Sequence, residues 1–116
     1  MGSETEPTTD QVLFVSSSRD GKRTVVTLAG ELDLHGSDRL TAEVQQALAD
    51  AAEIVEIDAG SLTFADSAGL RAVLMARSAT LDTGATFRLV SVSPSVGRVI
   101  EIAGLADELL PSAAGN

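Results

Sequence analysis

The chain has 116 residues, of which 44% are hydrophobic, 17 are acidic and 8 are basic. This length predicts one domain that buries its core without disulfides or metals, and the lack of cysteine excludes thiol catalysis and thiolate metal sites. The net charge of −9 argues against nucleic acid and anionic membranes as partners, because both attract basic surfaces.

The two ends of the chain differ from its centre in composition. Residues 1–10 are polar and contain Pro7, so we expect a flexible N-terminal tail, and we expect a C-terminal tail over 111–116. The domain between them then spans residues 11–110. No apolar run approaches the roughly 20 residues that cross a bilayer, and the N-terminus lacks a signal-peptide pattern. The expected location is therefore the cytoplasm, with no insertion into a membrane.

The predicted domain opens with a β-hairpin. Gln11–Ser18 and Arg23–Ala29 are rich in valine and leucine and are typical of strands. Asp20-Gly21 lies between them, and Asp-Gly is among the strongest short-range signals for a hairpin turn. The glycines of the next stretch predict a loop over residues 30–37.

A helix and a third strand follow this loop. Gly36 or Ser37 can cap the helix, which we expect to continue to about Asp50. Its apolar residues recur at helical spacing and predict one buried face, made by Leu40, Val44, Ala47 and Leu48. The short β-branched run Ile54–Asp58 predicts the third strand, and Ala59–Ala65 is expected to be a loop.

The next helix has the clearest start signal in the chain. Asp66 and Ser67 are both good N-cap residues, because a short side-chain oxygen can accept a hydrogen bond from a free N–H of the first turn. The helix is expected to reach about Thr80, with an apolar face made by Leu70, Val73 and Leu74. Gly69 costs a helix roughly 1 kcal/mol relative to alanine, which indicates that something approaches the backbone closely there.

The last part of the chain adds a strand and a helix. Phe87–Val92 predicts the strand, and Pro94–Ala103 predicts a helix that stops at Gly104. Leu105–Leu110 can add either a short strand or a further helical turn. Strands that alternate with helices after a hairpin predict an α/β fold with a mixed sheet, antiparallel at first and then mostly parallel.

Catalysis finds little support in the sequence. A hydrolytic triad would need Ser67, the single histidine His35 and an acid to converge, and the Gly-x-Ser-x-Gly elbow is absent. The chain lacks the phosphate-binding loop Gly-x-x-x-x-Gly-Lys-Ser/Thr. Four acidic residues could supply oxygen ligands, but they lack the spacing of a calcium loop: Glu31, Asp33, Asp58 and Asp66. The sequence therefore predicts a non-enzymatic domain that needs no cofactor or metal.

Ser67 has two interpretations. It can simply cap the helix, or its hydroxyl can be a phosphoacceptor among the small residues Asp66–Gly69. A phosphate at a helix N-terminus meets free N–H groups, so the fold should tolerate it, whereas a partner docked there would meet about −1.5 to −2 of new charge. Glu31 and Asp33 lie in the loop after the second strand, and this loop shares a rim with Ser67 if the second and third strands are neighbours.

Three motifs together resemble the STAS domain of bacterial anti-sigma factor antagonists. Gly30–Asp33 (GELD) follows a strand, Asp66–Leu70 (DSAGL) starts a helix, and residues 93–105 carry Ser-Pro and a later Gly-Leu. The resemblance covers about residues 11–110. It implies a STAS-like sheet of four or five strands with helices packed mainly on one side.

The resemblance also implies a function in transcription regulation, including stress responses. Such a protein binds an anti-sigma factor that is also a serine kinase, and binding releases a sigma factor. The kinase phosphorylates the antagonist, here on Ser67, and a serine phosphatase reverses the modification. ATP is bound by the kinase, so the chain itself needs no cofactor.

The implied partner surface lies around Ser67. It includes Asp33 and Asp66, and their neighbours Glu31, Ala68 and Gly69 share the same motifs. Many relatives carry a second hydroxyl residue where Ala68 stands, so Ser67 is the single acceptor here. STAS domains also occur in transporters and lipid-trafficking assemblies, and a scaffold without a phospho-switch is therefore the alternative.

Overall fold

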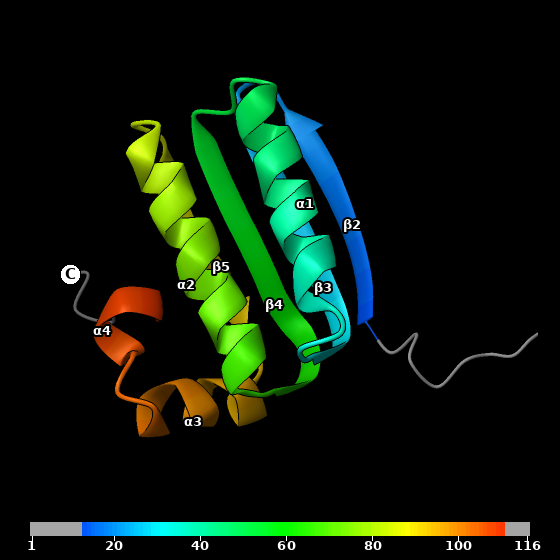
Figure 1. Cartoon of the computed structure of the whole chain (residues 1–116), viewed down its shortest axis with the longest axis vertical. Helices are drawn as coiled ribbons and strands as arrows, with labels where there is room; N and C mark the ends of the chain where they lie inside the picture. The colour runs from blue at the N-terminus through cyan, green and yellow to red at the C-terminus, as the bar shows by residue number, and fades with distance from the viewer. Residues whose placement is uncertain (1–12, 111–116) are drawn as a thin grey trace, which may run out of the picture.

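The computed structural model describes residues 13–110, and the two predicted tails, 1–10 and 111–116, lie outside this range. Within residues 13–110 the sheet has four strands in the order β2-β3-β4-β5, as Figure 1 shows. They are β2 (Leu13–Asp20), β3 (Arg23–Leu32), β4 (Ile54–Ala65) and β5 (Thr86–Val92). The β2–β3 pair is antiparallel, and the other two pairs are parallel. The predicted α/β fold with a mixed sheet is confirmed.

The described helices are α1 (Ser37–Ala49), α2 (Ser67–Asp82), α3 (Pro94–Ile102) and α4 (Ala106–Leu109). In Figure 1, α1 and α2 lie side by side over one face of the sheet, and α3 crosses the edge at which β4 ends. The segment 105–110, which the sequence left open between strand and helix, is a helical turn. None of the helices within residues 13–110 is long and apolar enough to cross a membrane.

The core lies between the sheet and the two long helices. Alternate residues of a strand point to opposite faces, so β3 buries every second side chain from Thr24 to Leu28, and β4 buries Val55, Ile57 and Ala59 on the same principle. The fully buried large side chains come from both layers and include Val26, Leu28, Leu32, Leu40, Val44, Val55, Ile57 and Ile100.

One predicted loop is wrong and another is shorter than expected, because the strands continue into them: the loop predicted over 30–37 is confined to 33–36. Residues 30–32 belong to β3, and Ala59–Ala65 belongs to β4. The glycines that suggest loops lie at irregularities in the β3–β4 pairing: the register shifts between Thr27 and Ala29 and again between Gly30 and Glu31. Gly30 has φ +100°, a conformation that other residues rarely adopt, so it lets the bulged strand continue.

The remaining boundaries agree with the sequence to within a few residues. The predicted first strand begins at Gln11, which lies outside the described residues, and α2 continues two residues past Thr80 to Asp82. Gly36 is the N-cap of α1 and caps without a side-chain hydrogen bond.

A charged group is buried near the start of the inner strand β4. The Glu56 side chain is 8% exposed, and its carboxylate lies 3.5 Å from the Arg23 guanidinium and 3.0 Å from the Arg88 guanidinium. These residues come from β4, β3 and β5. A buried carboxylate needs such partners, so the three strands are linked in one register on that face.

Candidate functional site

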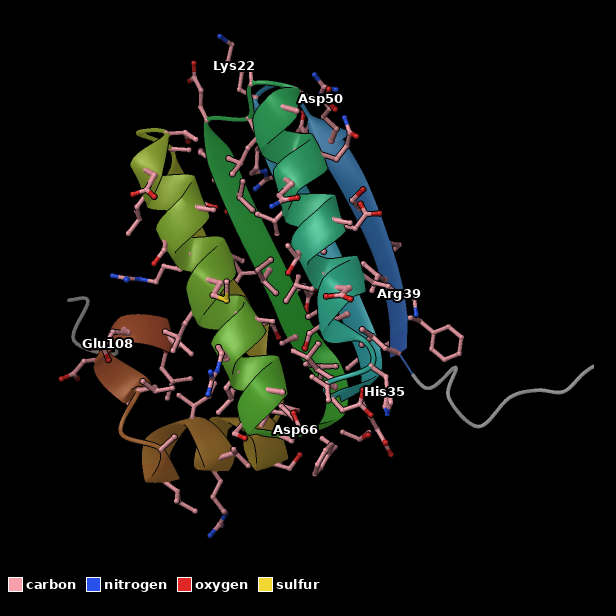
Figure 2. The ribbon with its side chains drawn as sticks, in the orientation of Figure 1. Lys22, His35, Arg39, Asp50, Asp66 and Glu108 are labelled. Atoms are coloured by element: carbon pink, nitrogen blue, oxygen red, sulfur yellow. The ribbon has the colours of Figure 1, made fainter. Side chains whose placement is uncertain are left out.

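The ends of β3 and β4 form one rim of the molecule. Leu32 pairs with Ala65 at the last register position, and the Asp66 N–H donates a hydrogen bond to the Leu32 carbonyl at 3.2 Å. The Ser37 hydroxyl lies 2.8 Å from the Asp33 carbonyl and 3.4 Å from the Ala68 carbonyl. Figure 2 shows His35 and Asp66 at this same end. The predicted neighbourhood of the two motifs is confirmed, because β3 and β4 are adjacent strands.

Gly69 allows the first turn of α2 to pack closely against the end of β3. It is buried, and a Cβ atom built on it would lie 2.2 Å from the Leu32 carbonyl oxygen. Only glycine permits that approach, since real Cβ atoms do not come so close to backbone oxygen. The close contact that a first-turn glycine indicates is therefore with the same chain, and it seats the first turn of α2 against the end of β3.

Asp33 shapes the loop that leads into α1. Its carboxylate accepts hydrogen bonds from the His35 N–H at 3.0 Å and the Gly36 N–H at 3.1 Å. The residue is half-buried, whereas Glu31 is exposed on the same rim. Three acids are predicted for the partner surface: Glu31, Asp33 and Asp66. Of the two before α1, Asp33 accepts hydrogen bonds from its own loop, and Glu31 is exposed toward solvent.

Asp66, and not Ser67, caps α2. The Asp66 carboxylate accepts a hydrogen bond from the Gly69 N–H at 2.8 Å. Ser67 is the first residue of the helix and is exposed, and its hydroxyl makes no hydrogen bond with any other residue in the range 13–110. The Ser67 hydroxyl is therefore accessible for modification, and it makes no hydrogen bond within residues 13–110 that a modification would break.

A hollow of about 410 Å³ lies beside Ser67, between the first turns of α1 and α2. Leu34 and Met75 line it and are 68% and 61% exposed. Asp38 and Arg71 line it too, one from each helix. Two large apolar side chains are therefore exposed beside the Ser67 hydroxyl.

Sequence reasoning missed Leu34, Arg71 and Met75. A spacing of four residues in the helix connects Ser67, Arg71 and Met75. Residues at this spacing share one helix face, so the sequence alone could have grouped them. Leu34 carries no comparable signal, because its position depends on how α1 packs against α2. No group of three His, Asp or Glu side chains that could hold a metal occurs in the described part of the chain.

Comparison with known proteins points to one family. Residues 15–111 match the family model described as "Mlab, STAS domain". An anti-sigma factor antagonist from Mycobacterium paratuberculosis is 23% identical, with 93% of this chain and 92% of that chain covered and a TM-score of 0.75.

The anti-sigma factor antagonist SpoIIAA is similar in both of its forms. Its unphosphorylated structure is 23% identical over 88% of this chain and 91% of that chain, with a TM-score of 0.72. Its phosphorylated structure, from Bacillus, is 22% identical over 88% of this chain and 95% of that chain, with a TM-score of 0.66. At identities this low, the structural similarity shows that the proteins share a fold.

The capping geometry predicts different effects for two adjacent substitutions. Asp66→Ala removes the cap and should lower the free energy of unfolding by about 1 kcal/mol. Ser67→Ala removes a hydroxyl without a partner and should change it by less than about 0.5 kcal/mol. Urea denaturation followed by circular dichroism measures both. A larger loss for Ser67→Ala than for Asp66→Ala would show that Ser67 is the cap.

The close approach at Gly69 predicts a second contrast between two helical glycines. Gly69→Ala should destabilise the protein by about 2 kcal/mol, because α2 must move away from the Leu32 carbonyl. Gly97→Ala is the control, since its new Cβ would lie an ordinary 3.6 Å from Val92, and it should stabilise α3 by up to about 1 kcal/mol. The same denaturation experiment compares them, and equal effects would contradict the packing described here.

Proposed function

The chain belongs to the STAS domain family, and on that premise we propose that it is an anti-sigma factor antagonist switched by phosphorylation of Ser67. In the unphosphorylated form it binds an anti-sigma factor with serine kinase activity and so releases a sigma factor. Phosphorylation of Ser67 by that kinase ends the interaction, and a serine phosphatase restores it. The protein acts by binding rather than by catalysis, in the cytoplasm, where it regulates transcription in response to stress.

The observation that carries this proposal is the exposed Ser67 hydroxyl at the start of α2. Asp66 supplies the cap, so a group added to Ser67 does not remove a hydrogen bond that the fold needs. Proteins of similar structure support the same function, because SpoIIAA is an anti-sigma factor antagonist that exists in an unphosphorylated and a phosphorylated form.

The predicted contact residues divide into two groups by their exposure. Glu31 and Ser67 are exposed and can touch a partner directly. The other four are half-buried or buried and give the rim its shape: Asp33, Asp66, Ala68 and Gly69. The exposed acid and the net charge of −9 favour a partner with a basic surface.

A phosphate on Ser67 acts on the partner rather than on the fold. It adds about −1.5 to −2 of charge at the centre of the proposed contact, close to Asp66. A charge that is left unpaired in a dehydrated interface costs several kcal/mol, and each 1.4 kcal/mol weakens binding about tenfold. One phosphate can therefore abolish binding while the domain stays folded.

The second candidate function is a STAS scaffold without a phospho-switch, as in transporter or lipid-trafficking assemblies. The description of the matching family model favours it, since that model is a "Mlab, STAS domain" model rather than one of antagonists. In that case Ser67 is an ordinary surface serine, and the rim binds a partner constitutively.

Phosphorylation of the purified protein distinguishes the two. The protein is incubated with ATP and each anti-sigma kinase from its own organism, and its intact mass and modified site are determined. We expect one phosphate, on Ser67. Ser67→Ala should remove it, whereas Ser78→Ala, which removes another exposed serine of α2, should not. A kinase-like partner that binds tightly but adds no phosphate to Ser67 would favour the scaffold.

A further inference from the structure

We propose that Arg71 holds the phosphate of phosphorylated Ser67, in an ion pair at the mouth of the hollow between α1 and α2. The inference rests on the proposed function, because it concerns the phosphorylated state of the same site. In this state the Arg71 guanidinium fixes the position of the phosphate group.

The geometry of α2 brings the two side chains together. Ser67 and Arg71 are four residues apart in a regular helix, both are exposed, and both line the hollow of about 410 Å³. Residues at this spacing lie on one face with Cβ atoms about 5–6 Å apart. A phosphate on the serine oxygen therefore comes within reach of the long arginine side chain.

Arg71 is uncommitted in the unphosphorylated protein. The ion pairs of the described residues use Arg19, Lys22, Arg23 and Arg88, and Arg39 donates to the Leu13 carbonyl. Arg71 takes part in none of the ion pairs or side-chain hydrogen bonds found within residues 13–110. Its guanidinium can thus turn toward a new anion without breaking an existing contact.

The charges around Ser67 favour a cation there. Asp66 precedes the serine, and Asp38 lines the opposite wall of the hollow. A dianion beside these carboxylates is repelled unless a positive group lies nearby, and Arg71 is the basic residue among those that line the hollow. A guanidinium can donate two parallel N–H bonds to phosphate, and an acid four residues before a base is the favourable order in a helix.

The pair has a consequence for the exposed apolar surface. Leu34 and Met75 line the hollow with Arg71. When the guanidinium moves to the phosphate, it lies over the part of the hollow next to Ser67. Phosphorylation then adds charge directly beside these exposed apolar side chains.

A titration of the phosphate tests the pairing. Phosphoserine is inserted at position 67 of the full chain during translation, so no kinase is needed, and ³¹P NMR follows the second ionisation of the phosphate. A nearby cation favours the dianion, so Arg71→Gln should move the midpoint upward by about half a pH unit. Arg71→Lys keeps the charge and should retain most of the effect, and added salt should reduce the difference.

Arg77→Gln is the matched control. It removes the same charge from the same helix, but residue 77 lies about 15 Å along the helix from residue 67, beyond the screening length of about 10 Å. We expect no change in its midpoint. The pairing would be wrong if Arg71→Gln left the midpoint unchanged. It would also be wrong if Arg77→Gln moved the midpoint by the same amount as Arg71→Gln. That result leaves the proposed function intact, whereas the absence of phosphorylation by any kinase defeats the proposed function whatever the titration shows.

Discussion

The approach of Gly69 to Leu32 is the contact on which the candidate site depends. A Cβ atom at position 69 would lie 2.2 Å from the Leu32 carbonyl oxygen, which also accepts the Asp66 N–H. The first turn of α2 is therefore seated directly on the end of β3. Because β3 and β4 are neighbouring parallel strands, the same contact brings the loop into α1 beside Ser67. The strand pairing sets Glu31 opposite Phe64 and so brings the exposed acid to the same rim as Ser67, and the Gly69 contact seats the first turn of α2 against that rim.

The polar groups at this rim have separate tasks. Asp66 caps α2, Asp33 orders the loop before α1, and the Ser37 hydroxyl lies between the Asp33 and Ala68 carbonyls. Ser67, Glu31 and Arg71 are exposed, and none of the three is tied to another described side chain. A modification of Ser67 can therefore change what the surface binds at little cost to the stability of the domain. This separation suits a reversible switch, which must pass between two charge states many times without unfolding.

Much of this arrangement could be predicted from the sequence, because it follows from local rules. Asp66 before a helical apolar pattern predicts the start of α2, and Gly69 predicts a close backbone contact. The sequence could not predict that Gly30 and the segment 59–65 continue their strands, since a glycine at a bulge and a glycine in a loop have the same local signal. Nor could it place Leu34 in the hollow, because that position depends on the packing of α1 against α2.

The affinity of the protein for its anti-sigma partner, measured with and without phosphate on Ser67, shows whether that residue controls binding. Calorimetry with the unmodified chain and with the chain that carries phosphoserine at position 67 gives both values under one set of conditions. A phosphate of about −1.5 to −2 keeps part of its charge uncompensated even beside Arg71, so an interface that buries it should lose at least about 100-fold in affinity. Affinities that agree within a few-fold, for two proteins that are equally folded, would show that Ser67 does not control binding.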